Sequence, residues 1–234
     1  MKTSKIIFIS LLSFIALIIL AATLSVRLTE QKKSESDNIL KTIKTPLPEF
    51  SVLDLDMFYN ITLRESTSNY IDLSVLKDSP VPKLNYYVKN DTLHIMNFQN
   101  PVPSILFITI HIAPGLQTIQ LKNSDFLVAK YSTKKLSFIL DNSKLNFILD
   151  YKENNSVNNL NITAKNLSFI TLYSMDIDSA NFVLRNSTAV LKFAPKYLGG
   201  NLTAGSKLNT VQPCEISLKS DSTSKIIISE KRVP

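Results

Sequence analysis

Serines recur at similar intervals in the C-terminal half of the chain, at Ser124, Ser143, Ser187 and Ser206. A serine nucleophile needs a base within hydrogen-bond reach, usually a histidine that a carboxylate orients. The two histidines, His94 and His111, precede all of these serines, and no Gly-x-Ser-x-Gly sequence occurs. The sequence therefore predicts no catalytic serine, and we expect both histidines to point outward from strands.

Carboxylates offer a second kind of chemistry. Glycoside hydrolysis needs two carboxyl groups about 5–10 Å apart. The repeating half of the chain provides five candidates: Asp141, Asp150, Asp176, Asp178 and Glu215. Only Asp176 and Asp178 are close in sequence with side chains on one face, and paired acids at a turn are usually solvated. We predict no catalytic residues and keep a carbohydrate-active enzyme as the alternative.

Metal and nucleic-acid sites are poorly supported. Cys214 is the only cysteine, which excludes an internal disulfide and a multi-cysteine metal site, and two histidines give little basis for zinc. No metal and no cofactor are expected. The net charge of +7 is spread along the chain without a dense basic block, and there is no tryptophan. Nucleic acid is therefore excluded as the expected partner.

Asparagine forms seven Asn-x-Ser/Thr sequences, which are the acceptors of N-glycosylation in exported eukaryotic proteins. They are Asn60, Asn90, Asn154, Asn161, Asn166, Asn186 and Asn201. Serine and threonine are so common in this chain that several matches arise from composition alone. Both readings stay open: glycan acceptors, or polar residues at bends.

The N-terminus contains a long apolar segment. Residues Ile6 to Val26 are uncharged, and lysines or an arginine flank both ends. The length suits a helix that crosses about 30 Å of hydrocarbon, whereas a cleaved signal has a shorter core. We predict a membrane anchor or uncleaved signal over residues 1–28, followed by a polar linker over 29–47. The remainder is expected on the periplasmic or extracellular side of the cell envelope.

Residues 48–230 are typical of an all-β domain. Short β-branched and aromatic runs alternate with Asn, Ser and Asp, and no helix-length amphipathic stretch occurs. Asn90-Asp91 separates two alternating segments, as in a hairpin turn.

The C-terminal half also repeats. Asn123, Asn142, Asn166, Asn186, Ala204 and Ser220 are spaced by 19, 24, 20, 18 and 16 residues. Residues two, four and six positions before each are almost all apolar, which predicts one buried face. After each bend a second inward row is expected, which includes Phe169 and Tyr173, Leu191 and Phe193, and Ile226 and Ile228. In the last two units the bend is expected to be one residue longer.

Each unit is therefore predicted to consist of a strand, a polar bend, a second strand and a turn. Such units bury their apolar faces only by stacking. We predict a single-stranded right-handed parallel β-helix, a β-solenoid, with an antiparallel β-sandwich as the alternative. The bend positions are Asn123, Ser124, Asn142, Ser143, Asn166, Asn186, Ser187, Gly205 and Ser206.

The segment LFITIHIAPGLQTIQLKNSDFLV, with the recurring strand and polar bend after it and NDTLHI before it, resembles the DUF2807 family of adhesin-like head GIN domains. The resemblance runs from about Phe50 to Ser229. Family members have Gly-Ser-Gly at the bends, whereas this chain has the bend sequences KNSDF, DNSKL, KNLSF, RNSTA and AGSKL. The resemblance implies an exported β-solenoid that is often held at the cell envelope.

These observations predict a non-catalytic binding or structural protein of the cell envelope, with an adhesin-like role. Rows of Asn, Ser, Thr and Lys suit many weak hydrogen bonds to a glycan or envelope polymer. The other partner class is an envelope protein, in which case the chain is a sensor or regulatory partner of a membrane complex. The oligomeric state is left open.

Overall fold

The computed structural model describes residues 17–25, 40–56, 58, 60–80, 83–96, 105–147, 155–173 and 175–230. They divide between two compact units. The first comprises Met1–Lys41 and Leu76–Ser79 and contains a short helix at residues 17–25. The second comprises Thr42–Val75 and Pro80–Pro234 and holds the apolar core.

Of the predicted transmembrane helix from Ile6 to Val26, the structure describes residues 17–25, which are helical. Among the described residues, no helix has the length and apolar character needed to cross a membrane. Ile6 and Val26 themselves lie outside the described residues, as does most of the predicted linker. The strand β1 (Leu40–Pro46) occupies the last part of that linker, so β structure begins before the predicted domain boundary at residue 48.

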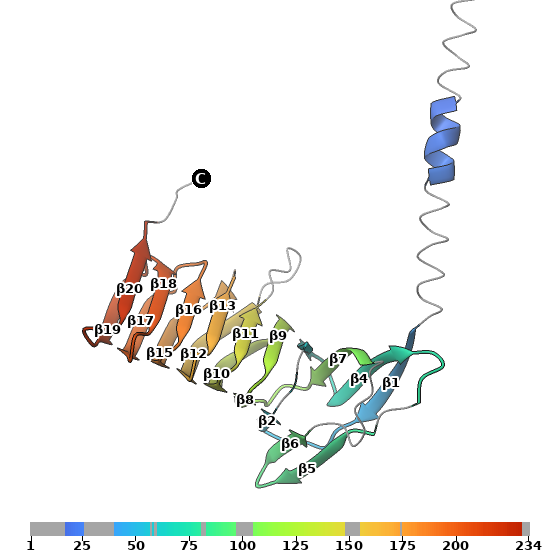
Figure 1. Ribbon diagram of the computed structural model, residues 1–234, viewed down its shortest axis with the longest axis horizontal. Coiled ribbons are helices and arrows are strands. Elements are labelled where there is room, and N and C mark those ends of the chain that lie inside the picture. The colour runs from blue at the N-terminus through green and yellow to red at the C-terminus, as the bar shows by residue number, and fades with distance from the viewer. Residues whose placement is uncertain are drawn as a thin grey trace, which may run out of the picture. The chain divides into compact units, whose positions relative to one another are not determined.

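The described chain is nearly all β and forms two large mixed sheets (Figure 1). The first sheet contains, in order, β1, β4 (Tyr70–Leu76), β7 (Ile105–Ile112), β3 (Ile61–Glu65), β9 (Asp125–Lys130), β11 (Lys144–Phe147), β13 (Phe169–Leu172), β16 (Thr188–Leu191), β18 (Lys207–Val211) and β20 (Lys225–Ser229). The second contains β19 (Glu215–Ser220), β17 (Tyr197–Thr203), β15 (Ser179–Arg185), β12 (Asn155–Lys165), β10 (Ser132–Asp141), β8 (Thr118–Lys122), β2 (Val52–Asp56), β6 (Thr92–Met96) and β5 (Asn85–Lys89). The short β14 (Met175–Asp176) pairs with β12.

The prediction of a single-stranded right-handed parallel β-helix is wrong, because the sheets are mixed. β4 pairs antiparallel with β7, and β5 pairs antiparallel with β6. β3 lies between β7 and β9, out of chain order. The antiparallel sandwich is also wrong, since the pairs from β8 to β20 are parallel.

A local turn explains one of the antiparallel pairs. Asn90 and Asp91 have φ of 50° and 59°, the left-handed conformation that a two-residue hairpin requires. They join β5 to β6, with Lys89 opposite Thr92. The hairpin expected at Asn90-Asp91 is therefore confirmed.

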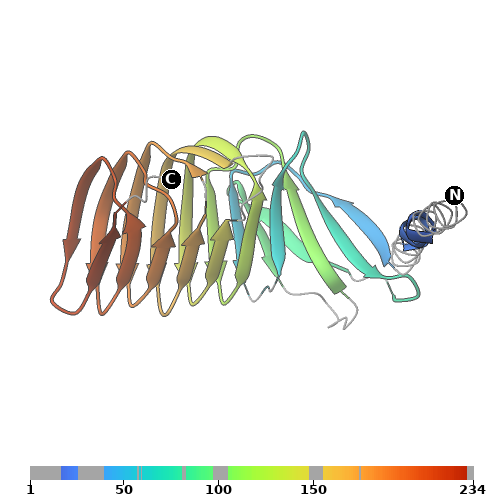
Figure 2. The same ribbon diagram turned by 90° about the horizontal axis from the view of Figure 1, so that it is seen from above.

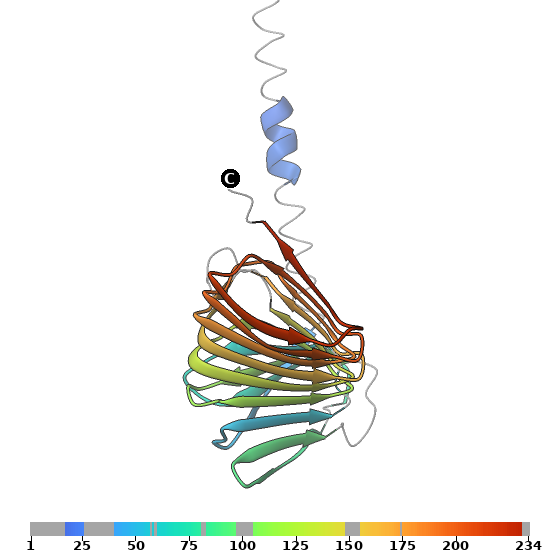
Figure 3. The same cartoon turned by 90° about the vertical axis from the view of Figure 1, so that its left-hand side faces the viewer.

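From residue 118 onward the chain passes from one sheet to the other at each corner (Figure 2). Strands pair in register with the next strand of the same sheet, so each inward side chain lies against an inward side chain at the same position. One such column is Leu121, Leu140, Ala164, Leu184 and Leu202, which are all buried. Figure 3 shows the resulting layers of strands.

The core lies between the two sheets. Phe138 of β10 and Phe147 of β11 meet edge to face with their ring centroids 5.8 Å apart, so they join the sheets through one aromatic contact. Tyr131 is buried at the edge of this core and donates a hydrogen bond to the carbonyl of Leu116 at 3.2 Å. Burial raises the pKa of Tyr131 to about 12, which keeps the phenol neutral.

At Gly200 the backbone lies close against the neighbouring strand β15. Gly200 has φ of 138° and pairs in register with the buried Phe182. A Cβ atom at Gly200 would lie 1.9 Å from the carbonyl oxygen of Phe182. Only glycine fits here, both for the backbone conformation and for space.

We expect Gly200→Ala to destabilise the protein more than Gly115→Ala. Gly115 also has positive φ, 133°, but nothing lies within 4 Å of an added Cβ. Its variant should lose about 1–3 kcal/mol through backbone strain. Gly200→Ala should lose about 1–3 kcal/mol beyond that because the backbone must move. Urea unfolding measures both, and equal losses would contradict the account of Gly200.

Candidate functional site

The corners that follow β8, β10, β12, β15 and β17 each contain a buried serine. These are Ser124, Ser143, Ser168, Ser187 and Ser206, all at most 5% exposed. Each hydroxyl donates to a backbone carbonyl two or three residues earlier, over 2.6–3.0 Å. Each hydroxyl therefore uses its proton in a hydrogen bond to the backbone, as in a structural turn. A nucleophilic serine would instead donate this proton to a base.

The serine hydroxyls also connect successive corners. Ser143 Oγ accepts from the amide of Ser124 at 3.1 Å, and Ser168 Oγ accepts from the amide of Ser143 at 3.1 Å. Further along, Ser206 Oγ accepts from Ser187 and Ser224 Oγ accepts from Ser206. We call this set of corner serines the serine ladder. It satisfies buried amides where the chain leaves one sheet for the other.

The residue that precedes these serines turns the chain. Asn123, Asn142 and Asn186 have φ of 47–49°, which asparagine tolerates better than most residues. Asn142 Nδ2 donates to Asn123 Oδ1 at 2.9 Å, so the side chains of the first two corners are joined by a hydrogen bond. Asn166, at φ of 56°, instead donates to Asp141 Oδ1 at 2.6 Å. That bond and the neighbouring Lys165 lower the pKa of Asp141.

The last corners use other residues. Ala204 and Gly205 have positive φ, and their amides donate to Asp221 Oδ2 at 2.7 Å and Thr223 Oγ1 at 2.9 Å. The bond from the Ala204 amide is the main reason that the pKa of Asp221 is well below its usual value. Sequence reasoning missed Asp221 and Ser168. Ser168 is identified only once Ile170 and Leu172 are known to point inward.

The third corner is one residue longer than predicted. Leu167 is inserted between Asn166 and Ser168, with φ of 66°, and shifts the alternation of β13 by one. Ile170 and Leu172 are therefore buried, while Phe169 and Tyr173 are 40% and 39% exposed. The prediction that Phe169 and Tyr173 point inward is wrong.

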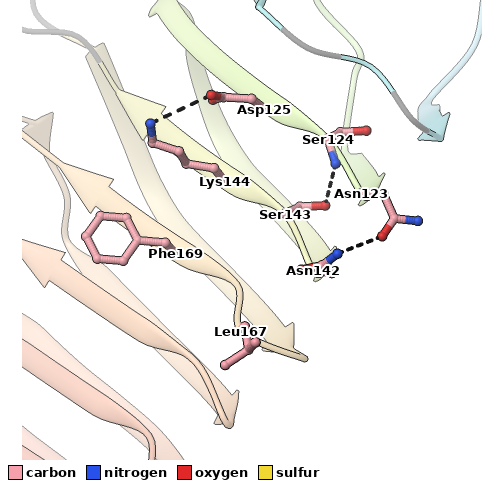
Figure 4. Close-up of a pocket in the computed structure, with 8 residues that line it drawn as sticks. All are labelled: Asn123, Ser124, Asp125, Asn142, Ser143, Lys144, Leu167 and Phe169. Carbon is pink, nitrogen blue, oxygen red and sulfur yellow. Dashed lines mark hydrogen bonds and ion pairs between the residues drawn. The ribbon is translucent and has the colours of Figure 1, made fainter.

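The inserted Leu167 helps to form a pocket of about 560 Å³ on the corner (Figure 4). Its polar part consists of the amides of Asn123 and Asn142, the corner serines and the ion pair between Asp125 and Lys144, 3.7 Å apart. Its apolar part is Leu167 and Phe169. Two hydrogen-bonded side-chain amides, one acid, one base and an aromatic ring thus line one pocket.

Leu167 is the most unusual residue of this pocket. Its side chain is 73% exposed, and its backbone is in the left-handed region that a bulky side chain avoids. Both features cost free energy, and neither is needed at the shorter corners 123–124 and 142–143. Residues with strained backbone conformations cluster at active sites and ligand-binding sites.

The two candidate acids lie elsewhere. Ile177 is buried, and Asp176 and Asp178 flank it. Asp178 Oδ1 lies 2.5 Å from Lys196 Nζ. The hydrogen bond to Asp178, together with the charges of Asp178 and Asp176, raises the pKa of Lys196. Asp141 is engaged by Asn166, Glu215 lies on β19, and Asp150 falls outside the described residues.

Each histidine is held by an aspartate and a tyrosine on the outer face of a sheet. His94 Nδ1 lies 2.8 Å from Asp54 Oδ2, and the imidazole stacks on Tyr87. His111 Nε2 lies 3.0 Å from Asp72 Oδ2, and the imidazole stacks on Tyr70.

Burial lowers the pKa of His111. The charges of Arg64 and Lys44 act in the same direction, against Asp72. In the described chain the hydroxyls of the corner serines reach backbone carbonyls instead of these imidazoles.

The other expected sites are placed as follows. Asn60, Asn90, Asn166, Asn186 and Asn201 are exposed, Asn161 is half-buried and Asn154 lies outside the described residues. Cys214 is free and exposed. Among the described residues, no three His, Cys, Asp or Glu side chains are grouped so that they could hold a metal.

No family model matches the sequence. No curated protein matches it either. The fold is similar to two crystal structures, each described as a "putative adhesin". The protein from Bacteroides fragilis has a TM-score of 0.55 at 12% identity, over 82% of this chain and 97% of that one. The protein from Parabacteroides distasonis has a TM-score of 0.55 at 13% identity, over 82% and 94%. At such identities the likeness shows the fold alone.

We expect Ser143→Ala to destabilise the protein by about 1–3 kcal/mol, because the buried amide of Ser124 loses its acceptor. Ser187→Ala removes a hydroxyl that donates to the carbonyl of Arg185. It should cost about 0.5–1.5 kcal/mol, the range of an ordinary hydrogen bond. Chemical unfolding measures the difference. A larger loss in Ser187→Ala would show that the serine ladder is assigned wrongly.

Proposed function

We propose that this chain is a non-catalytic binding protein of the cell envelope or extracellular space that binds a glycan or envelope polymer. The pocket between Asn123 and Phe169 is the proposed contact. The single observation that carries the proposal is Leu167, which is strained and exposed beside Phe169 and two side-chain amides.

The chemistry of the pocket supports a carbohydrate. The C–H face of a sugar ring packs on an aromatic side chain, and its hydroxyl groups both donate and accept hydrogen bonds. Asn142 uses one amide hydrogen for Asn123 Oδ1, so each of these two amides has further hydrogen-bonding capacity. Asp125 and Lys144 add an acceptor and a donor, which their weak, exposed ion pair leaves accessible.

The fold adds support of a coarser kind. Its likeness to the two proteins with adhesin-like names agrees with display of a binding surface outside the cytoplasm. We also propose that the chain is a divergent member of the DUF2807 family. Its corners then replace the family's Gly-Ser-Gly with Asn-Ser.

A carbohydrate-active enzyme is the second candidate, and one observation favours it. Asp176 and Asp178 both act on the charged Lys196, so two acids and a cation are grouped at the surface. Enzymatic cleavage of a bound polysaccharide that stops in Asp178→Asn would establish this candidate. An intact polysaccharide after prolonged incubation would exclude it for the polymers tested.

We expect Phe169→Ala to weaken glycan binding by about tenfold or more, because one face of the sugar loses its apolar partner. Tyr173→Ala is the matched control, since Tyr173 is an equally exposed aromatic residue that does not line the pocket. A glycan array with the full chain identifies the ligand, and calorimetry compares the variants. No binding to any glycan, or equal losses in both variants, would overturn the proposal.

A further inference from the structure

The two sheets of the second unit end on the same pair of strands. β19 is the terminal strand of one sheet and β20 of the other. In the described chain each is paired along one edge only, β19 with β17 and β20 with β18 (Figure 2). Two adjacent rows of backbone amide and carbonyl groups are therefore open to another strand.

The inward faces of these strands are uncovered as well. Ile216 pairs with Leu198, and Ile226 and Ile228 pair with Leu208 and Thr210. Leu198, Leu208 and Thr210 are at most 1% exposed, whereas Ile216 is 47% and Ile228 is 45% exposed. Positions that form the core in every preceding layer thus reach solvent in the last one. We call this surface, made of β19 and β20, the terminal edge.

The charges of β19 indicate the occupant of the terminal edge. When β19 pairs antiparallel with itself about Ser217, Glu215 lies opposite Lys219 of the second copy, twice by symmetry. Glu215, Ser217 and Lys219 lie on the outer face and are exposed, so both ion pairs form at the rim. The same register places Ile216 opposite Leu218 on the inner face. Opposite charges and apolar pairs directly across a ladder both stabilise it.

β20 fits the same arrangement. Pairing about Ile227 places Ile226 opposite Ile228 on the inner face and Lys225 opposite Ser229 on the outer face, without a clash of like charges. Ser217 and Ile227 lie near the middle of their strands, at similar distances from the corner at residues 221–224. One two-fold axis can therefore pass through both.

We propose that the terminal edge binds the terminal edge of a second copy of this chain, about a two-fold axis through Ser217 and Ile227. This pairing extends both sheets and covers the exposed core residues. A two-fold contact uses the same surface on both copies and leaves no open edge there, so assembly stops at the dimer. The proposal does not depend on the proposed glycan site, which lies at the corners around residues 123–125, 142–144 and 167–169.

Disulfide crosslinking tests the register. In Cys214→Ser/Ser217→Cys the two introduced thiols lie directly opposite, at a Cα separation of about 4.5–5.5 Å that a disulfide accepts. The matched control is Cys214→Ser/Asn201→Cys, because Asn201 is an exposed outward residue on β17. Its two copies are three strand spacings apart across the sheet and four residues apart along the strands, about 19 Å in all. We expect a crosslinked dimer of the full chain for Ser217→Cys, formed at least tenfold faster than for the control.

Charge reversal tests the partner. On the Cys214→Ser/Ser217→Cys background, Glu215→Lys places lysines opposite each other and should slow crosslinking about tenfold. Adding Lys219→Glu restores opposite charges and should restore the rate. All of these residues are exposed, so folding is not at risk. The proposal would be overturned if the Ser217 and Asn201 variants crosslink equally fast. It would also be overturned if neither charge change alters the crosslinking rate.

Discussion

In-register pairing of parallel strands is the constraint on which the C-terminal part of this protein depends. Because Leu121, Leu140 and Leu184 occupy one column, a shift of one residue in the pairing of these strands would expose an entire inner face. The corners must therefore turn the chain through a fixed path while their amides are buried. The serine ladder meets both needs: Ser143 and Ser168 each close their own turn through their hydroxyls and accept the amide of the preceding corner serine.

The repeat could be predicted because it is a pattern of side-chain direction. Alternation before each Asn identifies Phe138, Ile162 and Phe182 as inward, and they are buried. The pattern predicted a longer bend in the last two units but not in the third, so the insertion of Leu167 was missed and Phe169 was assigned to the wrong face. The antiparallel pairs of β4 with β7 and β5 with β6 were missed because period-two alternation does not specify the partner strand or its direction.

The candidate site lies at the corner whose length was predicted wrongly. Sequence reasoning identified Asn123, Asn142, Ser124 and Ser143 as bend residues, and they supply the polar half of the pocket. The apolar half comes from the longer corner, which turns Leu167 and Phe169 outward beside them. The proposed binding site therefore lies at the corner that departs from the predicted repeat. The serines, whose spacing first suggests nucleophiles, donate hydrogen bonds to backbone carbonyls. Through these bonds Ser124 and Ser143 fix the turns that line the pocket.

The exchange rate of the Ser124 amide proton tests the central claim most directly. This proton lies at a corner, outside the strand ladders, and Ser143 Oγ is its acceptor. NMR-detected hydrogen exchange should show protection close to that of the core strands in the native protein. In Ser143→Ala the Ser124 amide should exchange far faster, while the distant Ser206 amide, bound to Ser224, should not change. Rapid exchange of Ser124 in the native protein would contradict the account.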